Sequence, residues 1–471
     1  MSDINSSKKL SRRKFLGVST SMAVGGVVGG LVVGGLSGYF AAMSTQSTAQ
    51  RTVYQTVTAP VYQTVTAPAR TETITRTVTA GAAVREKTLK IGEIAGLSGG
   101  IAPYGVPLHN SRLIAVEEIN AAGGVVIGDT RYKLELVYVD GARRDDAIAA
   151  LERFVEQEGI KFILDGASSS NYYALGPIIK EKHPKALVIA SGGYDPATTK
   201  GIPNFFRNTF DTSDLFALEI KWLKKQGVRR LATLIDKNHA DAILYVEKLL
   251  PPAGFEIVAD ERYTTGQADF VPVLTKLKGL DFDALIWHGF EPDHVNIIKQ
   301  ARTVGLLPPK GQAPDYIWLS QSLAEPDFGG PLMGGDVSFY EGLYIDLFGT
   351  AADLPNATPR IRYIRNMYKK KFPDSVYVSW VSTGYDSVYI LVRALQKAGT
   401  VEDVPKVIDA LHKLTTWEVP ELTFNHPPGL IFDSEGQAHP IITMGKWENN
   451  SFKYITSTWE DAPEVHDPVK I

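Results

Sequence analysis

Two turns rich in glycine and serine have the residue types and spacing to do chemistry. The first, residues 96–100, fits the G-x-S-x-G pattern that exposes a nucleophilic serine, here Ser98, after a strand. The pattern predicts either a hydrolase or, more simply, a turn whose N–H groups bind an anion. A hydrolase also needs an acid and a histidine, and no spacing marks His239, His288 or His294 as that partner.

The second turn, residues 165–171, follows a short apolar strand and precedes a predicted helix. Ligands of open parallel sheets bind at the carboxyl ends of the strands. Hydroxyl groups and free N–H groups at a helix N-terminus suit a carboxylate, because the helix dipole favours a negative charge there. Capping by serine and asparagine explains the same residues. The turn therefore predicts a carboxylate site or an ordinary helix cap.

A cluster of histidine and acidic residues offers ligands for a metal ion, but it lacks a recognised ligand spacing. The start of a helix with acidic residues beside a strand end explains it equally well. The cluster consists of His288, Glu291, Asp293 and His294. The sequence contains no G-x-x-x-x-G-K-[ST] segment, so the chain is not itself a P-loop ATPase. We predict no metal and no cofactor.

The composition indicates a soluble globular protein with more than one domain. The chain has 471 residues, of which 44% are hydrophobic and 21% are charged. Its 49 basic and 52 acidic residues give a net charge of −3, which argues against a nucleic-acid-binding protein. There is no cysteine. This excludes disulfides, thiolate metal sites, cysteine nucleophiles and an anchor through a lipidated cysteine.

The first 43 residues predict an export signal rather than part of a fold. Residues 11–16 (Ser-Arg-Arg-Lys-Phe-Leu) resemble the twin-arginine export motif, and a glycine-, alanine- and valine-rich segment, residues 18–40, follows them. That segment is long enough to span a bilayer, which takes about 20 residues. Because residues 41–44 form a poor cleavage site, we expect the signal to be retained as a membrane anchor. An ordinary anchor with flanking arginines is the alternative.

Residues 44–86 predict an extended stalk. The octapeptide of residues 53–60 recurs without change as residues 61–68, and proline ends each copy. Such a repeat cannot bury a core, and its prolines interrupt helices and central strands. Signal, apolar span and stalk together place the residues after about 87 on the outer side of the cytoplasmic membrane.

Beyond residue 87 the apolar pattern alternates between strands and helices. The first series predicts strands at 88–95, 132–139, 162–164 and 187–190. A second series begins after Thr209 and predicts strands at 231–235, 256–260, 283–287 and 316–319. A third block predicts helices at 360–372, 384–398 and 404–414, then strands at 440–444 and 452–455. This order predicts an α/β fold of two doubly wound lobes with parallel sheets.

The order and spacing of several short motifs resemble the extracellular solute-binding proteins of branched-chain amino-acid ABC transporters, which have the type I periplasmic-binding-protein fold. The resemblance extends from about Thr88 to Ile455. It rests on Lys90-Ile91-Gly92, residues 97–100 with 102–105, residues 115–124, Asp140, residues 168–170, Phe206-Arg207, residues 300–302 with Gly305, and residues 385–388.

The resemblance implies two lobes joined by three chain crossings, with a ligand in the cleft between them. One lobe would comprise residues 87–209 plus about 345–437, and the other 210–344 plus about 438–471. It implies a non-enzymatic receptor that delivers an amino acid or a related small carboxylate or amide to the permease of an ABC importer. A secreted hydrolase that uses Ser98 and a sensory ligand-binding domain are the alternatives.

The same resemblance carries ligand-binding positions over to this chain. Ser168 would bind the ligand carboxylate, and Gly192 and Tyr194 would complete that subsite. The aromatic walls of the cleft would be Tyr104, Phe290 and Trp380.

Two positions depart from the family pattern. Gln321 stands where an acid pairs with the ligand's ammonium, and Ala240 stands where an aromatic residue of the second lobe is expected. A buried ammonium without a carboxylate partner is costly. The amine subsite is therefore expected to be weak and roomy unless another acid replaces the missing one. Candidates for that acid are Asp195, Glu291 and Asp293.

Overall fold

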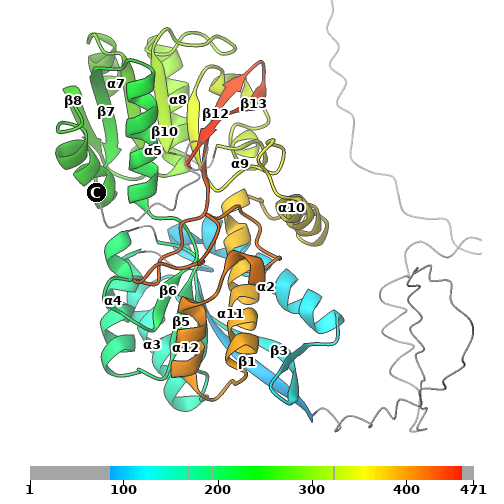
Figure 1. Cartoon of the computed structure of the whole chain (residues 1–471). Helices are drawn as coiled ribbons and strands as arrows, with labels where there is room; N and C mark the ends of the chain where they lie inside the picture. The colour runs from blue at the N-terminus through cyan, green and yellow to red at the C-terminus, as the bar shows by residue number, and fades with distance from the viewer. Residues whose placement is uncertain (1–84, 167–168, 194, 322–323, 459–471) are drawn as a thin grey trace, which may run out of the picture. The chain divides into compact units, whose positions relative to one another are not determined.

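The computed structural model describes residues 85–166, 169–193, 195–321 and 324–458 (Figure 1). The predicted export signal and apolar span, and nearly all of the predicted stalk, lie outside these residues. All described helices and strands belong to one compact unit, Thr79–Ile471. Within the described ranges, no helix combines the length and the apolar character needed to cross a membrane.

The first sheet has six strands in the order β2-β3-β1-β4-β5-β6, and all neighbours are parallel except β2 and β3. The strands are β1 (Arg85–Ala95), β2 (Val125–Ile127), β3 (Thr130–Asp140), β4 (Phe162–Asp165), β5 (Leu187–Ala190) and β6 (Phe205–Arg207). Its helices are α2 (Ala102–Ala121), α3 (Arg144–Glu152), α4 (Ser169–Glu181), α11 (Ser382–Ala398) and α12 (Val404–His412).

Helices cover both faces of this sheet, which explains the uninterrupted apolar runs of its central strands. In β4, Leu164 packs into the core formed with α2 and α11, whereas Ile163 packs into the core formed with α3 and α4. Figure 1 shows α2, α11 and α12 side by side. The carboxyl ends of β1, β4 and β5 therefore end at a common edge, where the glycine- and serine-rich turns begin.

The second sheet has seven strands in the order β13-β12-β11-β10-β9-β7-β8. They are β7 (Arg230–Asp236), β8 (Glu256–Tyr263), β9 (Ala284–His288), β10 (Ile317–Gln321), β11 (Tyr344–Phe348), β12 (Ile442–Glu448) and β13 (Ser451–Ser457). Its helices are α5 (Thr212–Lys225), α6 (Ala240–Leu244), α7 (Val271–Lys278), α8 (Glu291–Val304) and α9 (Pro326–Leu332). The predicted architecture of two α/β lobes is confirmed.

The sheets depart from the predicted parallel arrangement at their edges. Strands β12 and β13 are antiparallel and form a hairpin, because Asn449 and Asn450 both adopt positive φ angles and turn the chain between them. Strand β11, which the sequence pattern did not predict, lies between this hairpin and β10.

The chain passes between the two sheets three times, after β6, after β11 and before β12. The crossings hold one another. Gln437, in the third, accepts a hydrogen bond from Arg207 Nε (2.6 Å) and donates to the carbonyl of Thr209 in the first (2.6 Å). The rings of Phe210 and Phe348 stack 4.0 Å apart and join the first crossing to the second. The three crossings therefore form one hinge.

A charged group lies within this hinge. His439 contacts Asp214 of α5 through Nδ1 (2.7 Å) and Asp433 through Nε2 (3.4 Å). Burial alone would lower the pKa of His439, but the hydrogen bonds with these two carboxylates outweigh it and raise the pKa to about 10. The protonated ring therefore neutralises acids from both sides of the hinge at neutral pH.

One wholly buried ion pair fixes the core of the first lobe. Arg112 of α2 donates to Glu93 of β1 (2.8 Å), and His109 contacts the other carboxylate oxygen (2.6 Å). Burial alone would raise the pKa of Glu93, but the charge of Arg112 and the contacts with His109 keep it lowered. The carboxylate is therefore ionised and neutralises a guanidinium that has no access to water.

We predict that Glu93→Ala lowers the free energy of unfolding by about 3–5 kcal/mol, because it leaves the Arg112 charge buried without a partner. The control is Glu158→Ala, which removes the half-buried partner of the exposed Arg153 and should cost less than about 1 kcal/mol. Urea unfolding followed by circular dichroism measures both values. Equal losses in the two variants would show that the buried pair does not hold the lobe together.

Candidate functional site

The turns after β4 and β5 meet at the edge where the carboxylate subsite was predicted. Ser168 and Tyr194 fall outside the described residues, whereas Gly192 is described and is buried. Gly193 has a φ of 66°, and a Cβ atom there would lie 2.5 Å from Cε2 of Tyr172 and 2.9 Å from the backbone N of Ser169. Only glycine allows the two turns to approach this closely.

Two buried arginines hold these turns. Arg112 donates to the carbonyl of Asp165 (2.7 Å) and to Ser191 Oγ (3.2 Å). Arg207 donates to the carbonyls of Gly193 (2.9 Å) and Asp195 (2.6 Å). Both arginines are 0% exposed. The guanidinium groups therefore fix the backbone of the predicted subsite, and Arg112 is neutralised there by Glu93.

The charge of Arg112 is compensated by the carboxylate of Glu93, whereas the charge of Arg207 is not compensated in this way. Among the described residues, Arg207 hydrogen-bonds to carbonyl, hydroxyl and amide oxygens and makes no ion pair with a carboxylate, and its Nη2 has no partner. Burial is the main reason that its pKa is lowered, although nearby acids act in the opposite direction. An anion at the adjacent turns would offset this buried charge.

The predicted aromatic residues lie in both lobes. In the first lobe, the rings of Tyr104 and Trp380 are 6.4 Å apart and tilted by 38°, and Trp380 is 3% exposed. In the second, Phe290 precedes α8 and is half-buried, and its ring meets that of His239 edge to face at 4.7 Å. The structure therefore brings Tyr104 and Trp380 together, and separately pairs Phe290 with a residue that was not assigned to the cleft.

His239 supplies a ring beside the position where an aromatic residue was expected. Ala240 is exposed at the start of α6, and His239 is the residue directly before it. Burial lowers the pKa of His239, so the ring is neutral, and among the described residues its buried Nε2 has no hydrogen-bond partner. Its place shortly after β7, at the carboxyl end of a parallel strand, was the signal available in the sequence. The sequence had indicated His239 only as a candidate catalytic partner of Ser98.

Gln321 ends β10 and lies in a buried polar row of the second sheet. It is in register with His288 on β9 and with Asp346 on β11, and it is 4% exposed. Residues in register on adjacent strands point to the same face. Within the described part of the chain, Oε1 of Gln321 has no hydrogen-bond partner. A polar group of a ligand would satisfy it.

The carboxylates around Gln321 do not provide an obvious site for an ammonium. Glu219 of α5 contacts His288 Nε2 at 3.1 Å and is wholly buried with it. Burial, followed by the charge of Glu219 and a hydrogen bond with it, raises the pKa of Asp346 well above its usual range, which favours the neutral carboxyl. One buried acid is therefore paired with a histidine, and the environment of the other disfavours its charge.

The three acids considered as replacements each have a protein partner. Glu291 accepts a hydrogen bond from the hydroxyl of Tyr104 (2.5 Å), and Asp293 accepts one from the backbone N–H of Gly266 (3.0 Å). Asp195 accepts one from the backbone N–H of Ala197 (2.9 Å) and another from the hydroxyl of Tyr173.

The histidines considered as metal ligands contact separate protein partners. His288 contacts Glu219, and His294 contacts Ser320 Oγ (2.9 Å), so these histidines do not converge with Glu291 and Asp293 on one metal position. In the described ranges, the group with ligand atoms within 4.8 Å of one another is that of Asp211, Asp214 and His439 at the hinge. There Asp211 caps α5 by accepting hydrogen bonds from two backbone N–H groups.

Ser98 lies in an exposed turn. Its hydroxyl bonds to the carboxylate of Asp140, which also accepts from the backbone N–H of Leu97 (3.0 Å). Burial would raise the pKa of Asp140, but these hydrogen bonds outweigh it and lower the pKa. Among the described residues Ser98 therefore has an acid as its partner, rather than the histidine that a catalytic serine requires.

The two lobes contact each other around the cleft residues. The hydrogen bond from Tyr104 to Glu291 joins α2 to α8. Glu325, before α9, accepts hydrogen bonds from Ser379 through its hydroxyl (2.6 Å) and its backbone N–H, directly beside Trp380. These contacts close the lobes over the predicted aromatic residues.

A second set of contacts between the lobes joins α9 to α10 (Pro359–Lys371), which packs on α2. Asp327 accepts hydrogen bonds from Arg365 Nη2 (3.0 Å) and from Lys369. Opening the lobes would separate these charges as well.

Comparison with known proteins supports the fold and identifies the family. The sequence profile of the periplasmic binding protein family matches residues 88–450. The chain is 26% identical over 372 residues to the leucine-, isoleucine-, valine-, threonine- and alanine-binding protein of Pseudomonas aeruginosa. This alignment covers 77% of this chain and 91% of that protein. It is 28% identical over 332 residues to the Leu/Ile/Val-binding protein of Citrobacter freundii. That alignment covers 69% of this chain and 83% of the Citrobacter protein.

Two solved structures show a similar fold. LivJ from Streptococcus pneumoniae, in complex with isoleucine, matches with a TM-score of 0.65 at 23% identity, over 78% of this chain and 99% of that one. A solute-binding protein of an ABC transporter from Rhodopseudomonas palustris, in complex with 3,4-dihydroxybenzoic acid, matches with a TM-score of 0.65 at 20% identity, over 82% and 99%.

We predict that rising pH weakens the contact between the lobes through Glu325. Burial raises the pKa of Glu325 to about 8, although hydrogen bonds from Ser379 act in the opposite direction. The closed form therefore favours the protonated acid. Its contribution is complete below the ordinary pKa of 4.5 and is lost as pH rises through about 8.

Small-angle scattering of the ligand-free protein between about pH 5 and pH 9 measures this opening as an increase in radius of gyration. Glu325→Gln should remove the pH dependence in that window, because glutamine remains neutral. Glu448→Gln, at an exposed position on β12, is the matched control and should retain it. An identical pH response in wild type and Glu325→Gln would contradict the assignment.

Proposed function

This chain belongs to the periplasmic binding protein family, and we propose that it is an extracytoplasmic receptor that captures a small carboxylate for uptake by an ABC importer. The observation that carries the proposal is the pair of buried arginines, Arg112 and Arg207, behind the turns after β4 and β5. Arg112 is paired with Glu93 and holds the turn after β4. The charge of Arg207, which has no carboxylate partner among the described residues, favours an anion at the carboxyl ends of parallel strands, where ligands of such sheets bind. Closing of the lobes would then exclude water from it.

The ligand carboxylate would be bound by Ser168, Gly192 and Tyr194. Its apolar body would lie against the aromatic rings of Tyr104, Phe290 and Trp380. A cleft lined by aromatic residues with a few polar groups gives both affinity and orientation. In this proposal Gln321 faces the end of the ligand distant from the carboxylate.

A carboxylate without an α-ammonium is the ligand class we favour. Gln321 is neutral, and Glu291, Asp293 and Asp195 already have protein partners. The related protein of Pseudomonas aeruginosa is named for amino acids, whereas the similar structure from Rhodopseudomonas palustris contains an aromatic acid. Both ligand types therefore occur on this fold. The uncharged Gln321 is the observation that favours the acid lacking an amine.

We also propose that the receptor is held at the outer face of the cytoplasmic membrane. The apolar segment of residues 18–40 would be the anchor, and the repeat-containing segment of residues 44–86 would be the spacer. A permanently tethered receptor remains close to its permease, which raises the effective concentration of the pair.

We predict that wild-type protein binds 4-methylpentanoate, the deaminated analogue of leucine, at least as well as leucine. Gln321→Glu should shift the preference toward leucine, because it restores a carboxylate for the ammonium. Calorimetric titration of both ligands into both proteins measures the change. Gln396→Glu adds the same charge at an exposed position of α11 and should leave the preference unchanged. Wild type that binds leucine about a hundredfold (about 2.7 kcal/mol) more tightly would contradict this assignment.

We predict that the full-length protein fractionates with membranes in the cells that produce it. Proteolysis within residues 44–84 should release a soluble body that retains ligand binding, because the described fold begins with β1 at Arg85. Immunoblotting of membrane and soluble fractions, before and after limited proteolysis, checks both expectations. Recovery of the intact chain in the soluble fraction or the medium would exclude a retained anchor.

A further inference from the structure

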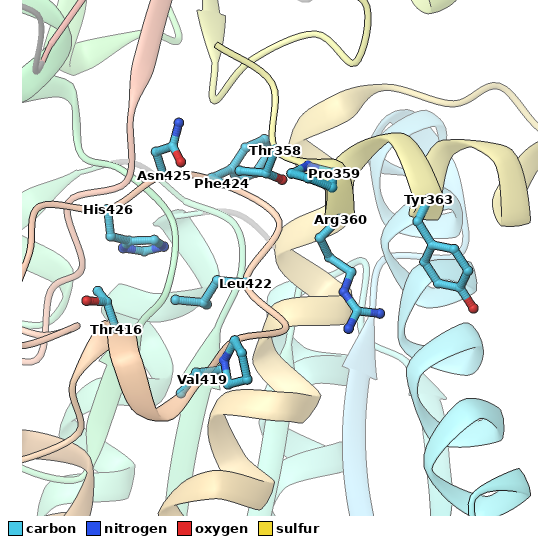
Figure 2. Close-up of a pocket in the computed structure, with 11 residues that line it drawn as sticks. Thr358, Pro359, Arg360, Tyr363, Thr416, Val419, Leu422, Phe424, Asn425 and His426 are labelled. Atoms are coloured by element: carbon cyan, nitrogen blue, oxygen red, sulfur yellow. The ribbon is translucent and has the colours of Figure 1, made fainter. Parts of the chain in front are cut away.

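A second cavity lies outside the cleft, on the side of the first lobe near the hinge. Its volume is about 620 Å³, within the range of roughly 300–1,000 Å³ that is usual for sites of small organic ligands. The cavity lies between the first turn of α10 and the segment of residues 416–426 (Figure 2). None of the residues assigned to the cleft lines it.

The lining combines an apolar wall with a few polar groups. The apolar side chains are Val419, Pro420, Leu422 and Phe424, with Tyr363 and Pro359 from α10. The polar residues are Arg360, Thr358, Thr416, Asn425 and His426. Figure 2 shows Arg360 on one side of the cavity and Leu422, Thr416 and His426 on the other. This arrangement suits a ligand with a flat apolar body and a charged end.

Arg360 is positioned by neighbours that leave part of its guanidinium available. Its Nη1 donates to Glu118 (3.2 Å) and to the hydroxyl of Tyr385 (3.1 Å), and its guanidinium carbon lies 5.4 Å from the ring centre of Tyr363. Among the described residues Nε and Nη2 have no hydrogen-bond partner. These two nitrogens form the side of the guanidinium that binds a carboxylate through two parallel hydrogen bonds.

His426 adds an unsatisfied polar atom to the opposite wall. Its Nδ1 is buried and, within the described ranges, has no hydrogen-bond partner. Burial, followed by the charge of His439, lowers the pKa of His426 to about 4, so the ring is neutral at pH 7. A neutral imidazole can donate or accept one hydrogen bond at this nitrogen. A polar substituent of a bound ligand would satisfy it.

The walls of the cavity are fixed by packing and are therefore preformed. Phe424 packs with Ala357, Ile361 and Ile441 in a small buried core. Thr358 Oγ1 donates to the carbonyl of Thr423 (2.5 Å), which joins the two walls directly. A rigid pocket loses little conformational entropy when a ligand binds.

We propose that this pocket is a second binding site, for a small organic carboxylate with a flat apolar body. The carboxylate would bind Nε and Nη2 of Arg360, and the body would lie against Val419, Leu422 and Phe424. The pocket is separate from the cleft, so occupancy of one does not require occupancy of the other.

The test is fluorine NMR of 4-fluorobenzoate with the full chain and its variants. We expect a bound signal that persists when the cleft is altered by Trp380→Ala. Arg360→Gln should weaken binding at this signal by about tenfold or more, because it removes the charge and the two parallel hydrogen bonds. Val419→Trp should abolish the signal by filling the cavity. Lys370→Gln, which removes an exposed charge from the same helix, is the matched control and should change nothing.

The ligand's charge gives an independent readout. The neutral 4-fluorobenzamide should bind the pocket about tenfold more weakly than 4-fluorobenzoate. If Arg360→Gln fails to fold, as judged by circular dichroism, Val419→Trp and the amide decide the question. A bound signal that disappears entirely in Trp380→Ala, or one that survives Val419→Trp, would overturn the second site while leaving the proposed cleft intact. Equal binding of acid and amide would overturn the role of Arg360.

Discussion

Two guanidinium groups of the first lobe are shut off from solvent, and neither can remain there without oxygen atoms around it. Arg112 obtains a carboxylate from Glu93 and also binds the turn after β4, whereas Arg207 binds carbonyls of the turn after β5 and Gln437 of the hinge. Satisfying these charges therefore fixes the turns that face the cleft. Because Arg207 has no carboxylate partner among the described residues, its charge makes that edge favourable for an anion, and the burial of the two guanidinium groups connects the core, the hinge and the proposed subsite.

The contacts between the lobes explain how such a site could open and close. Tyr104 with Glu291, Glu325 with Ser379, and Asp327 with α10 are polar contacts between the lobes, and water replaces them when the lobes separate. The hinge instead contains buried aromatic stacking and the ion pairs of His439. Opening at the hinge would therefore break the first set of contacts and leave the second in place. A ligand shifts the equilibrium between open and closed lobes toward the closed form, because it contacts both lobes only in that form.

The sequence predicted the two α/β lobes and placed the glycine- and serine-rich turns at strand ends, because buried parallel strands and turn residues have strong local patterns. It did not predict β11 or the antiparallel arrangement at that end of the second sheet, since β11 pairs with β12, a segment that is distant in the chain. The resemblance placed the aromatic position of the second lobe at Ala240, so the adjacent His239 was not predicted as the neighbour of Phe290. The partners of Glu291 and Asp293 could not be predicted, because side-chain pairing between lobes leaves no periodic signal.

A crystal structure with the tightest-binding small carboxylate, chosen from amino acids, aromatic acids and short aliphatic acids, tests the central claim most directly. The account predicts that the carboxylate lies between the turns after β4 and β5, within hydrogen-bonding distance of the backbone at Gly192 and in front of Arg112 and Arg207. The body of the ligand should contact Tyr104 and Trp380. A carboxylate bound instead at the Gln321 end of the cleft would contradict the account.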